Sequence, residues 1–254
     1  MTSPVDLAPD STVDAAEVAR FSAIAAEWWD PRGSMRMLHR LNPVRLAFIK
    51  DTLCGQFGRN TKDLNALAGL RVLDIGCGAG ILSEPLARMH ADVMGADPAA
   101  ANIAAAKLHA GQAGLRIDYR ASTAAALADA GERFDVVLAM EVVEHVADLN
   151  LFVRQCAQMI RPGGVMMAAT INRTLKSFAL AIVGAEYILR WLPRGTHRWE
   201  KFVTPDELSD AFEACGLTVL DETGVIYDLL ADRWRLASDM DVNYMMAAQK
   251  PMNV

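Results

Sequence analysis

Two carboxylates and an imidazole occur together where an apolar run ends. The run FDVVLAM, residues 134–140, is followed by Glu141, Glu144 and His145 in the segment EVVEHV. If the chain turns helical there, these side chains lie at i, i+3 and i+4 and share one face. They could take a proton from a hydroxyl, with a carboxylate orienting the imidazole, or they could hold Mg²⁺ or Zn²⁺. They could also be only a polar cap on a strand.

The elements that must position this group follow the order of an open α/β sheet. Short apolar strand patterns alternate with helical patterns between residues 70 and 170, and two more strand patterns follow at 217–228 and 242–250. This alternation predicts a mostly parallel sheet covered on both faces. The group at 141–145 would then lie at the carboxyl edge of the sheet, where open α/β folds bind ligands.

A glycine loop follows the first strand pattern. In VLDIGCGAG, residues 72–80, Gly76, Gly78 and Gly80 precede a helical segment, so that a ligand can come close to the backbone and to a helix N-terminus. Asp97 ends the second strand pattern, where a carboxylate suits the two hydroxyls of a ribose. The loop and Asp97 together predict a ligand that contains a ribose.

The chemistry around the loop selects among such ligands. A dinucleotide fingerprint that starts at Gly78 would need glycine in place of Ser83, and a Walker lysine is absent, so phosphate binding is poorly supported. Asp74, two residues before the loop, adds a negative charge that suits an ammonium or a sulfonium group. S-adenosylmethionine (SAM) has a ribose, an ammonium and a sulfonium but no phosphate. The sequence therefore favours SAM over NAD.

Composition and charge exclude several classes of protein. The chain has 254 residues, of which 52% are hydrophobic, and a net charge of −6, which suits one globular domain and argues against nucleic-acid binding. Four cysteines without a CxxC pair indicate a reduced cytoplasmic protein. The acidic start lacks the features of a signal peptide, and no apolar run reaches about 18 residues. We expect residues 1–13 to be a disordered tail.

Several blocks of the sequence resemble a known family. VLDIGCGAG is similar to the first motif of class I SAM-dependent methyltransferases, which are Rossmann-like. AEWWDP, LHRLNPVR, MEVVEHV and VGAEYILRWLPRGTH resemble, more narrowly, the bacterial O-methyltransferases of ubiquinone biosynthesis. This resemblance covers roughly residues 14–250.

The resemblance implies a single domain over 14–254. Its sheet would have seven strands, with the last one antiparallel, helices over 14–60 would cover the site, and an insertion at 173–201 would follow the fifth strand. It also implies cofactor contacts at Arg45, Gly76, Asp97 and Met140, with Arg45 pairing with the methionine carboxylate. Related enzymes often carry an acidic adenine ligand where this chain has Ser122 and Thr123.

The implied activity is O-methylation of polyprenylated phenols and catechols, 2-polyprenyl-6-hydroxyphenol and 3-demethylubiquinol. One alternative is a methyltransferase for another hydroxylated acceptor. Another is a non-catalytic cofactor-binding subunit that supports other ubiquinone-biosynthesis enzymes in a membrane-associated complex. Among the other histidines, His39 and His197 lie in blocks that would cover the site, whereas His90 and His109 are expected at the surface.

The segment 173–201 has the composition of a membrane-docking helix. Its centre, SFALAIVGAEYILRWL, carries only Glu186 and Arg190 as charged residues, and the whole segment has six basic and two acidic residues. It is too short to span a bilayer, but an apolar helix with a basic rim attracts anionic lipid. We therefore expect peripheral association with the inner membrane. The alternative is a buried lid over the active site.

Overall fold

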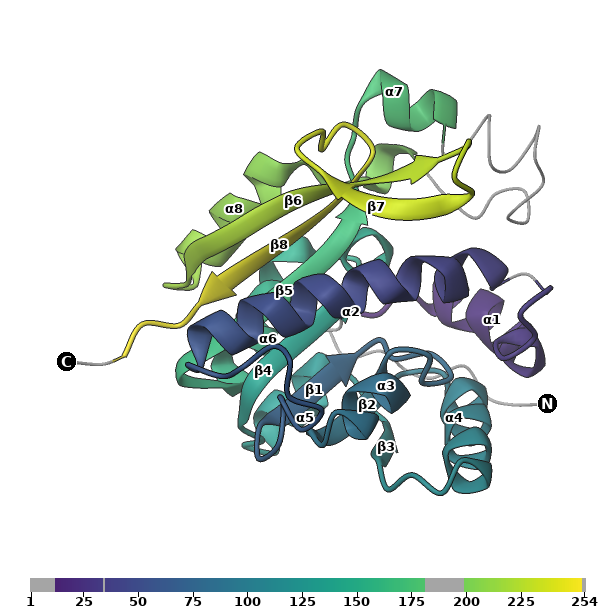
Figure 1. Ribbon diagram of the computed structural model, residues 1–254, viewed down its shortest axis with the longest axis vertical. Coiled ribbons are helices and arrows are strands. Elements are labelled where there is room, and N and C mark those ends of the chain that lie inside the picture. The colour runs from purple at the N-terminus through teal and green to yellow at the C-terminus, as the bar shows by residue number, and fades with distance from the viewer. Residues whose placement is uncertain (1–11, 34, 181–198, 253–254) are drawn as a thin grey trace.

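The computed structural model describes residues 12–33, 35–180 and 199–252. Within them the chain forms a sheet of eight strands in the order β3-β2-β1-β4-β5-β8-β6-β7 (Figure 1). The strands are β1 (Arg71–Ile75), β2 (Asp92–Asp97), β3 (Asp118–Ala121), β4 (Phe134–Met140), β5 (Ile160–Ile171), β6 (Thr218–Asp228), β7 (Arg233–Ala237) and β8 (Asn243–Gln249). The first five are parallel, and β8 is antiparallel to its neighbours β5 and β6. The predicted mostly parallel sheet with an antiparallel last strand is confirmed.

The predicted number of seven strands is too low by one. The additional strand, β7, pairs antiparallel with β6 at the edge of the sheet. In it Arg233 and Arg235 are exposed and alternate with Trp234 and Leu236. Such a short, charged edge strand lacks the apolar run that marks the buried strands in the sequence.

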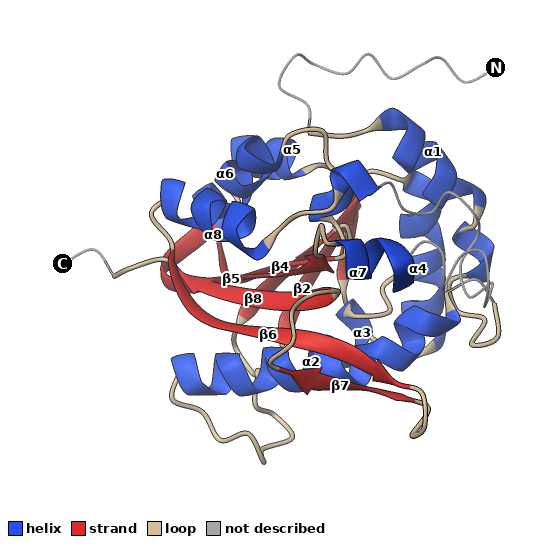
Figure 2. Ribbon diagram, turned by 90° about the horizontal axis from the view of Figure 1, so that it is seen from above, coloured by secondary structure: helices blue, strands red, loops and turns tan. Residues whose placement is uncertain are grey.

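Helices cover both faces of the sheet (Figure 2). One layer contains α5 (Ala124–Asp129), α6 (Leu149–Met159) and α8 (Pro205–Ala214), and the other contains α2 (Arg36–Gln56) and α3 (Ser83–Arg88). Successive side chains of β4 pack alternately against the two helical layers. Val137 and Ala139 pack in the core under α5, α6 and α8, whereas Val136 and Leu138 pack in the core under α2 and α3. The helix α4 (Ala100–Gln112) packs against β2 and β3.

The N-terminal helices lie across the carboxyl edge of the sheet. They are α1 (Ala15–Ala23), the short 3₁₀ helix η1 (Ala25–Glu27) and the first turns of α2, whose later turns pack on the face of the sheet. The helix α2 begins seven residues before Pro43, because Met37 and Leu41 are buried one turn apart and extend its apolar face toward the N-terminus. Val13, which was assigned to the tail, forms an antiparallel bridge with Val146. Residues 1–11 of that tail lie outside the described residues.

The ends of the 173–201 segment meet beside β5. They contain the short helix α7 (Leu175–Ser177) and the 3₁₀ helix η4 (Trp199–Lys201). Trp199 Nε1 donates a hydrogen bond to the carbonyl of Thr174 at 3.0 Å, and Arg173 Nη1 donates to the carbonyl of Phe202 at 3.1 Å. Residues 181–198, which include most of the predicted docking helix and His197, lie outside the described residues. Of the helices that are described, none is long and apolar enough to cross a membrane.

Candidate active site

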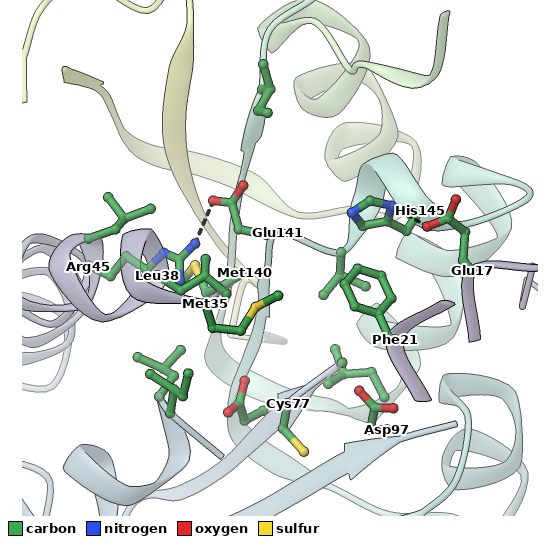
Figure 3. A pocket seen from close by; sticks show the side chains of 18 of the residues that line it. Glu17, Phe21, Met35, Leu38, Arg45, Cys77, Asp97, Met140, Glu141 and His145 are labelled. Atoms are coloured by element: carbon green, nitrogen blue, oxygen red, sulfur yellow. Dashed lines mark ion pairs between the residues drawn. The ribbon is translucent and has the colours of Figure 1, made fainter. Parts of the chain in front are cut away.

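A pocket of about 600 Å³ opens at the carboxyl edge of the sheet. One end is lined by the glycine loop, Asp74 and Asp97, and the other end by apolar residues of β6 and β7 such as Val225 and Trp234. Side chains from α1, α2 and the segment after β4 line the region between them (Figure 3). The pocket therefore connects the predicted cofactor site to a largely apolar compartment.

The glycine loop is shaped by close contacts with side chains as well as by its turn. Gly76, Gly78 and Gly80 have positive φ angles of 72°, 54° and 87°. A Cβ atom on Gly78 would lie 2.2 Å from the Trp28 ring, and one on Gly80 would lie 2.1 Å from the Tyr119 hydroxyl. Of the three glycines, Gly76 lines the pocket. The loop thus needs glycine partly for backbone conformation and partly for packing.

Asp97 is held by the backbone around it. Its carboxylate accepts hydrogen bonds from the N–H groups of Gly78 (3.0 Å) and Ala99 (2.8 Å) and from the side-chain amide of Asn102 (3.2 Å). The side chain is buried, and burial raises its pKa although these three hydrogen bonds oppose the shift. Asp97, the carboxylate predicted to bind a ribose, is therefore held in place at the wall of the pocket before SAM binds.

Asp74 is a second buried carboxylate at this end. It accepts a hydrogen bond from the Ser83 hydroxyl at 2.6 Å. Burial raises the pKa of Asp74 to about 6, while the Ser83 hydroxyl and the positive charge of Arg45 lower it. A buried carboxylate in this state is stabilised by an added cation, as expected for a site that receives an ammonium or a sulfonium.

Arg45 reaches the pocket from α2 and is only 5% exposed, so it does not lie on a solvated helix face. Its Nη2 atom lies 2.8 Å from Glu141 Oε1. Its Nε atom is buried and has no hydrogen-bond partner among the described residues, and the same is true of Asn102 Oδ1. An unpaired guanidinium N–H fits a ligand carboxylate, and an unpaired amide oxygen fits a hydroxyl or ammonium donor. These residues therefore fit SAM, and Met140 lines the same pocket while packing in the core under α2 and α3.

The three residues after β4 do not share one helical face. Glu141 has a φ of 58° and pairs with Arg45, and only Val143–His145 form a single 3₁₀ turn, η2. Glu144 is buried and accepts a hydrogen bond from the Thr170 hydroxyl at 2.8 Å. His145 Nδ1 lies 3.1 Å from Glu17 Oε2. Figure 3 shows Glu141 turned toward Arg45 and His145 turned toward Glu17, while Glu144 is bonded to Thr170, so the three side chains have different partners.

Because the three side chains point to different partners, they are not arranged as the predicted metal site requires. His145 Nε2 lies 4.0 Å from Glu144 Oε1, and Glu141 is occupied by Arg45. No group of three His, Cys, Asp or Glu side chains among the described residues is arranged to hold an ion. As placed here, Glu141, Glu144 and His145 do not fit Mg²⁺ or Zn²⁺, and no catalytic step is assigned to a metal.

The other residues singled out in the sequence lie partly where they were expected and partly elsewhere. Ser122 and Thr123 line the pocket near Asp97, and His90 is exposed as expected. His109 is not a free surface residue, because its Nδ1 lies 2.6 Å from the buried Glu84 and its ring stacks on Trp29. His39 Nε2 lies 2.8 Å from the Trp28 carbonyl oxygen and braces the N-terminal cover.

Sequence reasoning missed Glu17 and Phe21, which both line the pocket. They belong to α1 and lie one turn apart, so that they reach the same neighbour, His145. The only signal in the sequence was a carboxylate next to the apolar face of an N-terminal helix. That pattern is too common to identify a site residue.

The parallel sheet, the glycine loop after β1 and the acidic residue at the end of β2 define a class I SAM-dependent methyltransferase. Residues 30–222 match the family model of the methyltransferase domain. The chain belongs to the ubiquinone biosynthesis O-methyltransferases: it is 61% identical to the protein of that name from Nitrobacter winogradskyi, covering 95% of this chain and 92% of that one. The protein of that name from Bradyrhizobium diazoefficiens is also 61% identical, over 95% of each chain.

The fold also matches solved structures at low sequence identity. Magnesium protoporphyrin IX methyltransferase from Synechocystis PCC 6803, crystallised with bound SAH, superposes with a TM-score of 0.60 at 16% identity, covering 92% of this chain and 94% of that one. The same enzyme with bound SAM gives a TM-score of 0.59 at 15% identity, covering 97% and 99%. The methyltransferase fold and the family predicted from the sequence blocks are thus confirmed.

Proposed function

We propose that this chain methylates a phenolic hydroxyl of polyprenylated intermediates in ubiquinone biosynthesis, with SAM as methyl donor. The observation that carries the proposal is the single pocket that joins the SAM-binding residues to an apolar compartment. The two acceptors are 2-polyprenyl-6-hydroxyphenol and 3-demethylubiquinol. An isoprenoid tail would be received by the apolar residues of β6 and β7, and the ring would lie near His145.

The residues at the cofactor end bind SAM and orient it. Arg45 holds the methionine carboxylate, Asp97 holds the ribose hydroxyls, and Asp74 favours the positive charge through its buried carboxylate. When bound, SAM supplies an electrophilic methyl group on a sulfonium. Trp28 packs against the glycine loop and covers this end of the pocket, and Phe21 packs between Trp28 and His145, so that both rings shield the pocket from water.

The acceptor end must provide a base. A phenol has a pKa of about 10, so at neutral pH its oxygen has to lose the proton as it attacks. His145 is 17% exposed, lines the pocket and has one ring nitrogen that is not occupied by Glu17. We assign the proton transfer to this nitrogen, Nε2. Glu144, buried and bonded to Thr170, holds the turn that carries His145.

Methyl transfer from isotope-labelled SAM to a short-chain prenyl catechol tests the function. The expected product is the monomethyl ether, formed by wild-type protein and not by His145→Ala. A simple phenolic acceptor without a prenyl group serves as the comparison substrate. Transfer to that acceptor alone would support a methyltransferase of different specificity, and no transfer to either would support a non-catalytic binding subunit.

We further propose that residues 173–201 dock on an anionic membrane surface. The described start of this segment has Leu175, Phe178 and Leu180 exposed, and both Lys176 and Leu180 line the pocket. Leu229 and Leu230, in the turn between β6 and β7, are also exposed. Exposed apolar side chains around the opening of an apolar pocket suit a substrate that is drawn from a bilayer.

Vesicle flotation tests the membrane proposal. Binding should require phosphatidylglycerol or cardiolipin, weaken with added salt, and be lost when residues 177–192 are deleted from a protein that still binds SAM. Equal binding to neutral vesicles, or no binding to any vesicle, would favour a lid over the pocket instead.

A further inference from the structure

The N-terminal segment is fastened to the turn that carries His145. Val13 forms its bridge with Val146, and the N–H of Ala147 donates a hydrogen bond to the carbonyl of Thr12 at 2.9 Å. Asp14 caps the N-terminus of α1 and also accepts from Lys201 Nζ at 2.7 Å. Since α1 starts directly after this attachment, its first turn is placed against η2.

The first turn of α1 presents Glu17 to His145. Glu17 Oε2 lies 3.1 Å from His145 Nδ1, and both side chains are 17% exposed (Figure 3). The hydrogen bond with His145 is the largest influence on the pKa of Glu17 and lowers it, and Arg20, which also pairs with Glu17, acts in the same direction. One turn further along α1, the Phe21 ring meets the imidazole edge to face, with ring centroids 5.3 Å apart. The imidazole is therefore oriented by two residues of the same helix.

The two nearer carboxylates in the sequence are held by other residues. Glu141 pairs with Arg45 on the opposite side of the pocket. Glu144 accepts a hydrogen bond from Thr170, and its Oε1 lies 4.0 Å from His145 Nε2, beyond hydrogen-bond distance. Burial raises the pKa of Glu144, so this carboxyl group is not a strong partner for a cation. Glu17 is the carboxylate that faces the imidazole at Nδ1.

We propose that Glu17 is the positioning residue of the methyl transfer, holding the proton of His145 on Nδ1 so that Nε2 faces the acceptor hydroxyl as a proton acceptor. This inference rests on the proposed function. A carboxylate bonded to one ring nitrogen fixes the tautomer and orientation of the ring, as in other sites where histidine acts as a base. The base of the reaction would thus be completed by the N-terminal helix, far away in the sequence.

The proposed step balances in protons and electrons. The hydroxyl proton of the acceptor moves to His145 Nε2, an oxygen electron pair forms the bond to the methyl carbon, and the electrons of the carbon–sulfur bond stay on sulfur. The positive charge of the sulfonium is replaced by that of the imidazolium. The Glu17 carboxylate stabilises this imidazolium until it releases its proton to solvent.

Nuclear magnetic resonance of ¹⁵N-histidine-labelled protein tests the positioning role directly. The chain has five histidines, and the signals of His145 are assigned by their loss in His145→Gln. At about pH 8.5, well above the usual histidine pKa, wild-type protein should carry the His145 proton on Nδ1. In Glu17→Gln and Glu17→Ala the proton should move partly or wholly to Nε2. Glu27→Gln, a matched change at an exposed position of the same N-terminal cover, should leave the signals unchanged.

Kinetics supply the second measurement. Glu17→Gln should lower kcat for a prenyl catechol by at least about tenfold and by up to about 10⁴-fold if the tautomer is wholly reversed, as when the carboxylate that orients a catalytic histidine becomes an amide. Its Kd for SAM should stay within about twofold of wild type, and Glu27→Gln should behave as wild type. An unchanged tautomer in both Glu17 variants overturns the proposal, as does a parallel loss of SAM affinity, which would indicate a structural role. If wild-type protein transfers no methyl group, the proposed function fails, but the tautomer measurement still decides the role of Glu17.

Discussion

The two ends of the pocket are built in different ways. At the cofactor end, Asp97 is bonded to Gly78, Ala99 and Asn102, all within the consecutive elements β1, α3, β2 and α4. At the acceptor end, each polar side chain after β4 depends on a residue from another element: Arg45 for Glu141, Thr170 for Glu144 and Glu17 for His145. Apart from Arg45, which comes from α2, the first end is a local structure, whereas the second end is assembled throughout by tertiary contacts.

This difference has a consequence for function. A cofactor site made of consecutive elements can be kept by many enzymes that share a fold while their acceptors differ. An acceptor site that depends on α1, α2 and η2 together can change whenever one of these elements changes. Mutations at the cofactor end should therefore act on SAM affinity, and mutations at the acceptor end should act on turnover.

The largest effect is expected from His145→Ala. Loss of the general base should lower kcat by about 10²–10⁴-fold while the Kd for SAM is unchanged. Steady-state kinetics with a prenyl catechol and calorimetry with SAM measure the two quantities. A result in which chelation abolishes activity and His145→Ala does not would contradict the base role. Glu141, Glu144 and His145 would then have to regroup around an ion when substrate binds.

Asp97→Ala should produce the next largest effect, on affinity. The carboxylate would make two hydrogen bonds to the ribose, each worth about 1.5–3 kcal/mol for a charged group, so the Kd for SAM should rise by at least about tenfold. Calorimetry measures the change, and a thermal melt verifies that the variant folds, because Asp97 also ties Gly78 to Ala99. Unchanged affinity in a folded variant would mean that the ribose lies elsewhere.

A pH dependence of SAM binding is expected from Asp74. Its pKa is about 6 in the folded protein, and a cation binds best to the ionised form. If only that form binds, affinity for SAM should rise about tenfold between pH 5 and pH 7. Calorimetry across this range measures it, with Asp74→Asn as the control that should lose most of the dependence. A flat profile in wild-type protein would show that Asp74 does not face the positive charge.

The same shift has an opposite effect on the stability of the unliganded protein. The folded-state pKa of Asp74 is raised from the usual 3.8 to about 6, so between these two pKa values the folded protein binds more protons than the unfolded chain. The free energy of unfolding should therefore decrease by up to about 3 kcal/mol as the pH rises from about 3 to 7. The buried Asp97, whose pKa is also raised, acts in the same direction.

The sequence signals for the cofactor end are local, and the structure brings the residues that carry them, Asp74, Gly76 and Asp97, to one pocket. The glycines of the loop and the aspartates beside them follow one another along the chain, and β4 has the bounds of its apolar run, Phe134–Met140. The acceptor end could not be predicted in this way. The turn at Glu141 depends on a non-glycine residue with positive φ, which no pattern marked, and it removes the shared face on which the metal hypothesis rested.

Elements at the periphery were also missed for physical reasons. The edge strand β7 has exposed arginines in place of an apolar run, and α8 begins with a capping box at Thr204 and Glu207 that was not used as a signal. The partner of His145 could not be found from the sequence, since no periodicity relates a residue of α1 to one after β4. Only the packing of the N-terminal cover on the sheet brings Glu17 there.

The smallest expected effect concerns the Arg45–Glu141 pair, where the two ends of the pocket meet. If Arg45 binds the methionine carboxylate, Glu141 and that carboxylate compete for one guanidinium. Glu141→Gln should then tighten SAM binding by a few-fold, because Arg45 is released from its internal partner.

The same variant should be less stable without SAM, since Arg45 is 5% exposed and would lose its charged partner in the folded state. Calorimetry and thermal melts with and without SAM measure both effects, and a larger SAM-induced rise in Tm for Glu141→Gln than for wild type is expected. Glu144→Gln, a matched change at a carboxyl group that bonds to Thr170 instead of Arg45, should leave SAM affinity unchanged. Weaker SAM binding in Glu141→Gln would show that Glu141 holds Arg45 in its binding position. In that case a residue of the acceptor end, Glu141, would contribute to SAM affinity. The separation between mutations that act on affinity and mutations that act on turnover would then fail at this pair.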